Sequence, residues 1–125
     1  MAIFQQTLEK LQHFTLLATT TITGTGDQTG VDLKDYDGDI QVILSGTAAG
    51  SGADLTFRLE ESADDVTYTA VTGGGFTVIG NAAYKEVKTF NRDGLKRYVR
   101  LSCTAETGTA SSAVTCFGYG LKKYG

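Results

Sequence analysis

A cluster of cations is the first feature of this sequence that could do chemistry. Four basic residues fall within residues 92 to 101, RDGLKRYVRL: Arg92, Lys96, Arg97 and Arg100. Such a cluster could bind a polyanion, yet the whole chain has a formal net charge of -3 at pH 7 and lacks the positive field that attracts nucleic acid or anionic membranes. Residues 91 to 94 favour a turn, and successive side chains of a strand point to opposite faces. We therefore expect these cations to be divided between a turn and two strand faces, with neither nucleic acid nor membrane as a partner.

Partners for these cations are available elsewhere in the chain. Arg58 and Glu60, or else Lys85, Glu86 and Lys88, can supply cross-strand pairs if their strands are adjacent. Each exposed pair would contribute about 0 to 1 kcal/mol. Any external partner of the basic stretch is expected to be an acidic protein surface. Leu95 is expected to enter the core where the strand begins.

An acidic stretch, DLKDYDGDI at residues 32 to 40, has the spacing with which a calcium loop begins. Asp35, Asp37 and Asp39 would be the first three ligands. Ile40 stands where the loop needs its glycine, and Gly46 where it needs the bidentate glutamate. Because Asp and Gly also build tight turns, we expect YDGD at residues 36 to 39 to be a turn and no metal to bind.

The residue types that most often catalyse reactions do not form a recognisable site. His13 is the only histidine, and no serine or cysteine stands in a nucleophile motif such as G-x-S-x-G. Glu60 and Glu61 are neighbours in an expected strand, so their side chains point to opposite faces and cannot act as a glycosidase pair. The glycine runs match neither the P-loop nor the dinucleotide fingerprint. The sequence predicts no catalytic or cofactor-binding residues, no enzyme activity and no small-molecule substrate.

The two cysteines predict how the last strands pair. Cys103 and Cys116 would lie directly opposite each other in a hairpin centred between Thr109 and Ala110. Opposed residues of a non-hydrogen-bonded pair have Cα atoms about 4.5 Å apart, at the short end of the disulfide range. A disulfide is geometrically possible there, whereas apolar neighbours and cytoplasmic synthesis favour two reduced core thiols. Two cysteines and one distant histidine do not supply the four ligands of a zinc site.

Tyrosine is the residue type that would support sugar binding. The chain has six tyrosines and no tryptophan, the residue that often forms the aromatic platform of a carbohydrate-binding module. The tyrosines are scattered: Tyr36, Tyr68, Tyr84, Tyr98, Tyr119 and Tyr124. A carbohydrate-binding module is therefore an alternative interpretation, in which replacing exposed tyrosines weakens binding.

The elements that would position these residues are β-strands. The chain is rich in threonine and glycine and has no proline, which favours pleated strands joined by tight turns. Apolar and polar residues alternate at 40 to 44, 55 to 60 and 98 to 103, as in half-buried antiparallel strands. Turn signals between such runs, including GGG at 73 to 75, indicate about eight strands. The pattern predicts an all-β fold, an antiparallel β-sandwich of jelly-roll or immunoglobulin-like type, with a small barrel as the alternative.

The N-terminal segment is expected to differ from the rest. Phe4, Leu8 and Leu11 follow the i, i+4, i+7 spacing of one helical face, with Phe14 one turn later. This predicts a short helix or extended arm at residues 1 to 14, followed by a single β-sandwich domain at residues 15 to 125. No apolar run approaches the roughly 18 residues of a spanning helix, and none near the start matches a signal peptide. We therefore expect synthesis and folding in a cytoplasm.

Two segments resemble a known group of proteins. They are LTFRLEESADDVTYTAV at residues 55 to 71 and GLKRYVRLSCTAETGTASSAV at residues 94 to 114. Together they resemble small structural proteins of tailed bacteriophage heads, described as capsid decoration, cement or minor head proteins. The resemblance covers about residues 20 to 120, and GLKRYVRL is its most specific part.

The resemblance implies a non-enzymatic β-sandwich of the virion. Proteins of this group bind the major capsid protein at the capsid surface after synthesis in the host cytoplasm. They typically act as symmetric homo-oligomers, often trimers, and stabilise the shell by mass action because they bind only the assembled lattice. A tail or head-to-tail structural component is the alternative, because such components use similar sandwiches.

Overall fold

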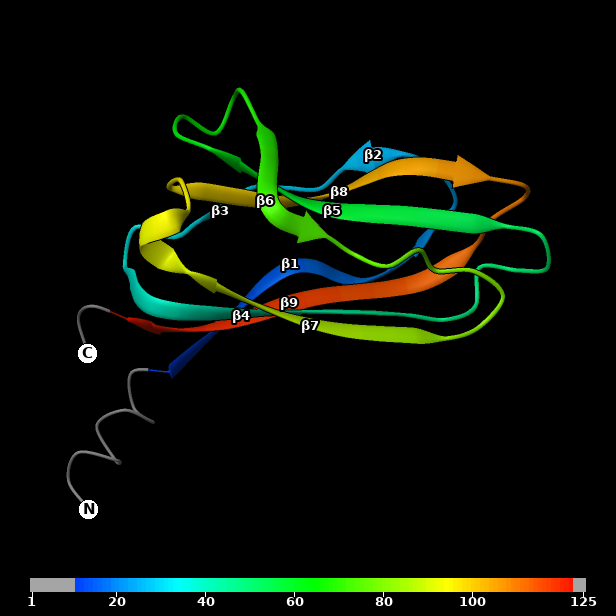
Figure 1. Cartoon of the computed structure of the whole chain (residues 1–125), viewed down its shortest axis with the longest axis horizontal. Helices are drawn as coiled ribbons and strands as arrows, with labels where there is room; N and C mark the ends of the chain where they lie inside the picture. The colour runs from blue at the N-terminus through cyan, green and yellow to red at the C-terminus, as the bar shows by residue number, and fades with distance from the viewer. Residues whose placement is uncertain (1–10, 123–125) are drawn as a thin grey trace, which may run out of the picture.

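The protein is a sandwich of two antiparallel β-sheets (Figure 1). Its structure, a computed structural model, describes residues 11 to 122. The elements of this part are β1 (Leu11–Ile22), β2 (Gly26–Asp27), β3 (Val31–Asp32), β4 (Tyr36–Gly46), β5 (Asp54–Ser62), β6 (Thr69–Gly75), β7 (Tyr84–Asn91), the 3-10 helix η1 (Arg92–Gly94), β8 (Tyr98–Thr107) and β9 (Ser112–Lys122). Sheet A has the order β1-β9-β4-β7. Sheet B has the order β2-β8-β5-β6, with β3 also paired to β8. The predicted all-β antiparallel sandwich is confirmed.

The connections between the sheets are those of a jelly roll. Within the sheets, β1 pairs with β9, β2 and β3 pair with β8, β4 pairs with β7, and β5 pairs with β6. We count β2 and β3 as one interrupted strand. The first strand then pairs with the last, the second with the second last, and so on toward the middle of the chain, as in a jelly roll. Of the two sandwich types that the sequence left open, the jelly roll is therefore the observed one.

Alternating side chains fill the space between the sheets. The most deeply buried positions are at most 4% exposed and include Ile40, Val42 and Leu44 from β4, Leu55, Phe57 and Leu59 from β5, and Val99, Leu101 and Cys103 from β8. These are the positions that the period of two predicted. Leu95, just before β8, is also buried as expected. Within residues 11 to 122, no helix is long and apolar enough to cross a membrane.

The predicted hairpin between the two cysteines is wrong. β8 and β9 lie in different sheets, because the chain crosses from one layer to the other between them. Cys103 therefore pairs with Phe57 of β5, and Cys116 pairs with Leu44 of β4. Both thiols are buried and neither forms a disulfide, so the expectation of two reduced core thiols agrees with the structure although the pairing does not.

Two of the predicted turns lie within strands. Residues 36 to 39 open β4 and form a bulge, since the register with β9 shifts between Asp37 and Gln41. Gly38 has a φ of 70°, which an L side chain rarely adopts, so glycine permits this bulge. Residues 73 to 75 similarly end β6. These residues thus belong to the strands themselves, at the start of β4 and at the end of β6.

The first described strand begins where a helix was expected. β1 starts at Leu11, so the helical interpretation is wrong for residues 11 to 14. Phe14 and Leu16 are buried while Thr15 between them is exposed, which is the alternation of a strand. The rest of the predicted helix or arm, residues 1 to 10, lies outside the described residues.

Gly118 is a close-packed point of the core and gives a test of it. A Cβ at Gly118 would collide with the ring of Phe14, which in turn stacks edge-on against Tyr36 with ring centroids 5.3 Å apart. We expect Gly118→Ala to lower the free energy of unfolding, measured by urea denaturation, by about 1 to 3 kcal/mol through overpacking. Gly24→Ala is the control, because a Cβ there meets nothing within 4 Å. Equal stability of the two variants would contradict this packing.

Candidate functional site

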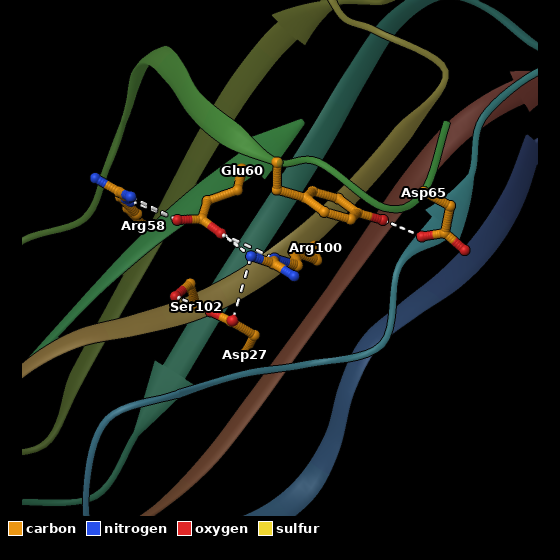
Figure 2. Close-up of polar contacts among 7 residues, drawn as sticks. Asp27, Arg58, Glu60, Asp65, Arg100 and Ser102 are labelled. Atoms are coloured by element: carbon orange, nitrogen blue, oxygen red, sulfur yellow. Dashed lines mark hydrogen bonds and ion pairs between the residues drawn. The ribbon is translucent and has the colours of Figure 1, made fainter. Parts of the chain in front are cut away.

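The outer face of sheet B carries a buried carboxylate held by two arginines (Figure 2). Glu60 is only 4% exposed although it lies on the outer side of β5. Arg58, two residues away on the same face, reaches Glu60 Oε2 with Nε at 2.8 Å and Nη2 at 2.6 Å. Arg100, opposite on β8, reaches Oε1 with Nε and Nη2, both at 2.8 Å. Each carboxylate oxygen thus binds one guanidinium, a strong charge-assisted arrangement. We call these three residues the Glu60 clamp.

The clamp is tied to the short strand β2. Arg100 Nη2 also lies 3.2 Å from Asp27 Oδ2, and Ser102 Oγ donates a hydrogen bond of 2.7 Å to Asp27 Oδ1. Figure 2 shows Asp27 and Ser102 below the clamp. Because β2 contains only two residues, these side-chain contacts supplement a minimal backbone ladder. They join β2, β8 and β5 across one face.

Tyr68 covers the clamp from the β5–β6 loop, which we define as residues 63 to 68. Its ring lies 4.0 Å from Arg100 Cζ, a cation-π contact, and its hydroxyl donates to Asp65. The β2–β3 connection packs against the same place, because a Cβ on Gly30 would collide with the Tyr68 hydroxyl. The loop is therefore anchored to sheet B at its C-terminal end.

Asp64 determines the shape of the rest of this loop. Its Oδ1 accepts hydrogen bonds from the Val66 and Thr67 amides and the Ser62 hydroxyl, at 2.9, 3.0 and 2.8 Å. These bonds, with that from Thr67 the largest contribution, lower the pKa of Asp64 to about 2. Val66 follows within the loop, with 78% of its surface exposed. In Figure 1 the connection between β5 and β6, to which Val66 belongs, projects away from both sheets.

The predicted basic stretch binds mainly within its own chain. Arg92 donates to the carbonyls of Leu33 and Leu95 at 2.8 and 3.0 Å. Arg97 forms a two-point ion pair with Asp32 at 3.0 and 2.9 Å. This pair lowers the pKa of Asp32, chiefly through the hydrogen bond from Arg97, and raises the pKa of Arg97. The side chains of both arginines therefore serve to hold the β3 region against the start of β8.

The expected division of the cations is confirmed in part. Arg92, Lys96 and Arg97 lie before β8 and only Arg100 lies on a strand face, the outer one, so the expected second strand face carries none of them. Of the two sets of cross-strand partners offered by the sequence, the one with Arg58 and Glu60 supplies Glu60 to Arg100. The alternative partners at residues 85 to 88 lie on β7 of sheet A, so they are wrong for this stretch. Lys96 is exposed, and its backbone amide donates to Glu61 at 2.9 Å.

The acidic stretch is used in local contacts. Asp32 binds Arg97 and also accepts from the Lys34 amide, and Asp37 accepts from the Gly38 amide at 2.9 Å. Asp39 is exposed on β4. Among the described residues, no group of three or more His, Cys, Asp or Glu side chains is placed to hold a metal ion.

The thiols and the histidine lie apart from one another. Burial raises the pKa of Cys116 to about 12 and also raises the pKa of Cys103, so neither is a thiolate at neutral pH. His13 lies on the exposed face of β1, with its ring 5.4 Å from the rings of both Phe117 and Tyr119. Neither cysteine has the environment of an activated nucleophile.

The tyrosines are distributed over both faces and the core. Tyr36 packs on Phe14 in the core, Tyr68 covers the clamp, Tyr84 packs at the core edge, Tyr98 lies 5.0 Å from Arg97, Tyr119 lies beside His13, and Tyr124 is outside the described residues. Sequence reasoning assigned no role to Tyr68, Asp27 or Ser102. The signal for the network was the opposite charge of Glu60 and the basic stretch on strands that the sequence predicts.

Comparison with known proteins identifies the fold. No protein-family model matches the sequence, and no curated protein matches it. The SPBc2 prophage-derived protein YomS superposes with a TM-score of 0.53 and 14% identity, over 88% of this chain and 93% of that one. A chain of infectious bursal disease virus, Gx strain, gives 0.54 and 9% identity over 91% of this chain, which spans only 32% of that longer chain. The CBM22-1 xylan-binding domain from Paenibacillus barcinonensis Xyn10C gives 0.47 and 14% identity over 92% and 83%, too distant to bear on function. At these identities, YomS and the virus chain share the fold alone.

Removal of the clamped charge tests the network. In Glu60→Gln, the amide oxygen can still accept from one guanidinium, but the amide NH2 group faces the other, which loses its acceptor, and the negative charge between the two arginines is lost. We expect the free energy of unfolding to fall by about 2 kcal/mol, measured by urea denaturation. Asp93→Asn, at an exposed carboxylate of η1, should change it by less than about 0.5 kcal/mol. A Glu60→Gln variant as stable as the control would show that the clamp contributes nothing.

The pH dependence of the β5–β6 loop tests the role of Asp64. Its pKa is lowered when folded, so its stabilising contribution is present above the ordinary value of 3.8 and is lost as the pH falls toward about 2. We expect the amide proton shifts of Val66 and Thr67, followed by NMR, to titrate with a midpoint near pH 2. In Asp64→Asn this titration should disappear. A midpoint near 3.8 would mean that the carboxylate does not hold the loop.

Proposed function

We propose that the protein is a non-enzymatic structural component of a bacteriophage virion, and more specifically a capsid decoration or cement protein that binds and stabilises the assembled head. The resemblance of residues 55 to 71 and 94 to 114 to phage head proteins supports this proposal. The jelly-roll fold, shared with a prophage-derived protein and with a chain of a virus, is consistent with it.

The observation that carries the proposal is the ordered β5–β6 loop. It holds Val66, 78% exposed, within a projection whose shape is maintained by Asp64 at one end and Tyr68 at the other. An apolar side chain in this position gains free energy when a partner covers it. Because the loop is already ordered, binding loses little conformational entropy. A preorganised projection of this kind suits stoichiometric attachment to a protein surface.

The proposed partner is the major capsid protein, and the proposed assembly is a homo-oligomer, with a trimer favoured. Asp64 and Asp65 directly precede Val66, so a matching capsid surface would present an apolar pocket with basic residues on one side of it. The basic stretch would contribute less than the sequence suggested, since three of its four cations are held within the chain. Binding that is specific to the assembled lattice would stabilise the shell by mass action. The proposed location is the capsid surface.

Replacement of Val66 in the β5–β6 loop tests this function. Binding of purified protein to heads that lack it should weaken at least about tenfold in Val66→Asp, because burying a valine is worth about 1.5 to 3 kcal/mol. Heads with this variant should also lose their added resistance to heating. The variant should fold normally, because Val66 is largely exposed. Val78→Asp, at a residue that is 43% exposed between β6 and β7, should bind as the unchanged protein does.

Two results would contradict the proposal. If Val66→Asp and Val78→Asp bind heads as well as the unchanged protein, the loop is not the attachment site. If the protein occurs only on capsid-free tails, or in a few copies per virion, it is a tail or head-to-tail component instead.

A further inference from the structure

The outer face of sheet A carries aromatic and polar side chains that take no part in the proposed attachment through the β5–β6 loop. Strand pairing aligns outward side chains in rows that run across β1, β9, β4 and β7. One row contains His13, Tyr119, Gln41 and Thr89, and the next contains Thr15, Phe117, Ile43 and Val87. All eight are exposed or half-buried. This face thus combines aromatic rings with amide and hydroxyl groups and carries few charges.

A hollow of about 430 Å³ lies over the first row. Its lining consists of Asp39, Gln41, Thr89, Tyr119, Gly120 and Leu121. The volume lies within the range of about 300 to 1,000 Å³ that is typical of small-ligand sites. Hydrogen-bonding groups from three adjacent strands, β4, β7 and β9, therefore converge on one depression of the sheet.

The ring of Tyr119 is held in place before any ligand arrives. His13 and Phe117 contact it with their rings at centroid distances of 5.4 and 5.8 Å and interplanar angles of 67° and 87°. These edge-to-face contacts brace the ring from β1 and from β9 itself. Because Tyr119 also lines the hollow, a ligand there meets an aromatic side chain whose rotamer need not be ordered on binding.

We propose that this hollow binds a neutral oligosaccharide. A pyranose ring has an apolar C–H face, which suits the electron-rich ring of Tyr119, and a rim of hydroxyls. The amide of Gln41, the hydroxyl of Thr89 and the carboxylate of Asp39 supply donors and acceptors for that rim. Asp39 is the one charged residue of the lining among residues 11 to 122, so an acidic sugar is repelled and a neutral sugar is favoured.

The proposed sugar site does not depend on the proposed attachment to a capsid. The β5–β6 loop belongs to sheet B, whereas the hollow lies on sheet A, the other layer of the sandwich (Figure 1). A copy attached through Val66 would leave the hollow available to a glycan. A variant that loses glycan binding is therefore expected to bind heads normally, and a variant that loses head binding is expected to bind glycans normally.

Glycan binding by the full chain tests the site. The probe is an array of neutral oligosaccharides of glucose, xylose, mannose and N-acetylglucosamine, followed by calorimetric titration with the strongest neutral binder. We expect Tyr119→Ala to weaken binding at least about tenfold and Gln41→Ala about fivefold. Tyr119→Phe should retain most of the affinity, because it keeps the ring. Tyr98→Ala, on the outer face of sheet B, is the matched control and should bind unchanged.

Three results would overturn the proposal. They are the absence of binding to every neutral oligosaccharide on the array, equal binding by Tyr119→Ala and the unchanged protein, and a preference for acidic glycans. Light scattering of the same variants tests whether a second copy of the chain, and not a glycan, occupies this face. If Tyr119→Ala changes the oligomeric state while no glycan binds, this face is an interface between copies of the chain.

Discussion

The surface features of this protein depend on the apolar layer between its two sheets. The inward side chains of β4, β5 and β8 are almost completely buried, and because strand side chains alternate, burying one set places the other set on the outer faces. The jelly-roll pairing then decides which outward residues become neighbours: β5 lies beside β8 in sheet B, and β4 lies between β7 and β9 in sheet A. One outer face thereby gains the Glu60 clamp and the other gains the aromatic row with Tyr119. A shared core supports two surfaces of different chemistry.

The clamp shows how a buried charge shapes a loop. Taking Glu60 out of water is costly, and four short contacts to Arg58 and Arg100 offset that cost. With its guanidinium oriented by Glu60 and Asp27, Arg100 presents a face on which the Tyr68 ring rests. Tyr68 in turn fastens the end of the loop that carries Val66. The ion pairs on the outer face of sheet B therefore help to fix the β5–β6 loop through the contact between Arg100 and Tyr68. This loop carries the side chain of Val66, which is 78% exposed.

The alternation of apolar and polar residues predicted the central strands and their buried faces, because this signal lies within each strand's own sequence. The pairing of Cys103 with Cys116 was wrong because a short connection in sequence can turn back within one sheet or cross to the other, and only the whole set of strand pairings decides between them. Likewise, Leu11 and Phe14 fit a helical spacing as well as a strand, and packing chose the strand. Opposite charges indicated two alternative sets of partners for the basic stretch, and the strand pairing selects the set that contains Glu60, which binds Arg100. The contact of Tyr68 with Arg100 depends on how the β5–β6 loop folds back over sheet B, and no local sequence pattern predicts that.

The central claim is that this jelly roll is a structural protein of the virion attached to the head through its β5–β6 loop. Cryo-electron microscopy of virions that contain the protein tests it most directly. The account predicts density for the sandwich in many symmetry-related copies on the outside of the shell, with Val66 buried against the capsid protein. Heads without such density, or copies whose β5–β6 loop points into solvent, would contradict it.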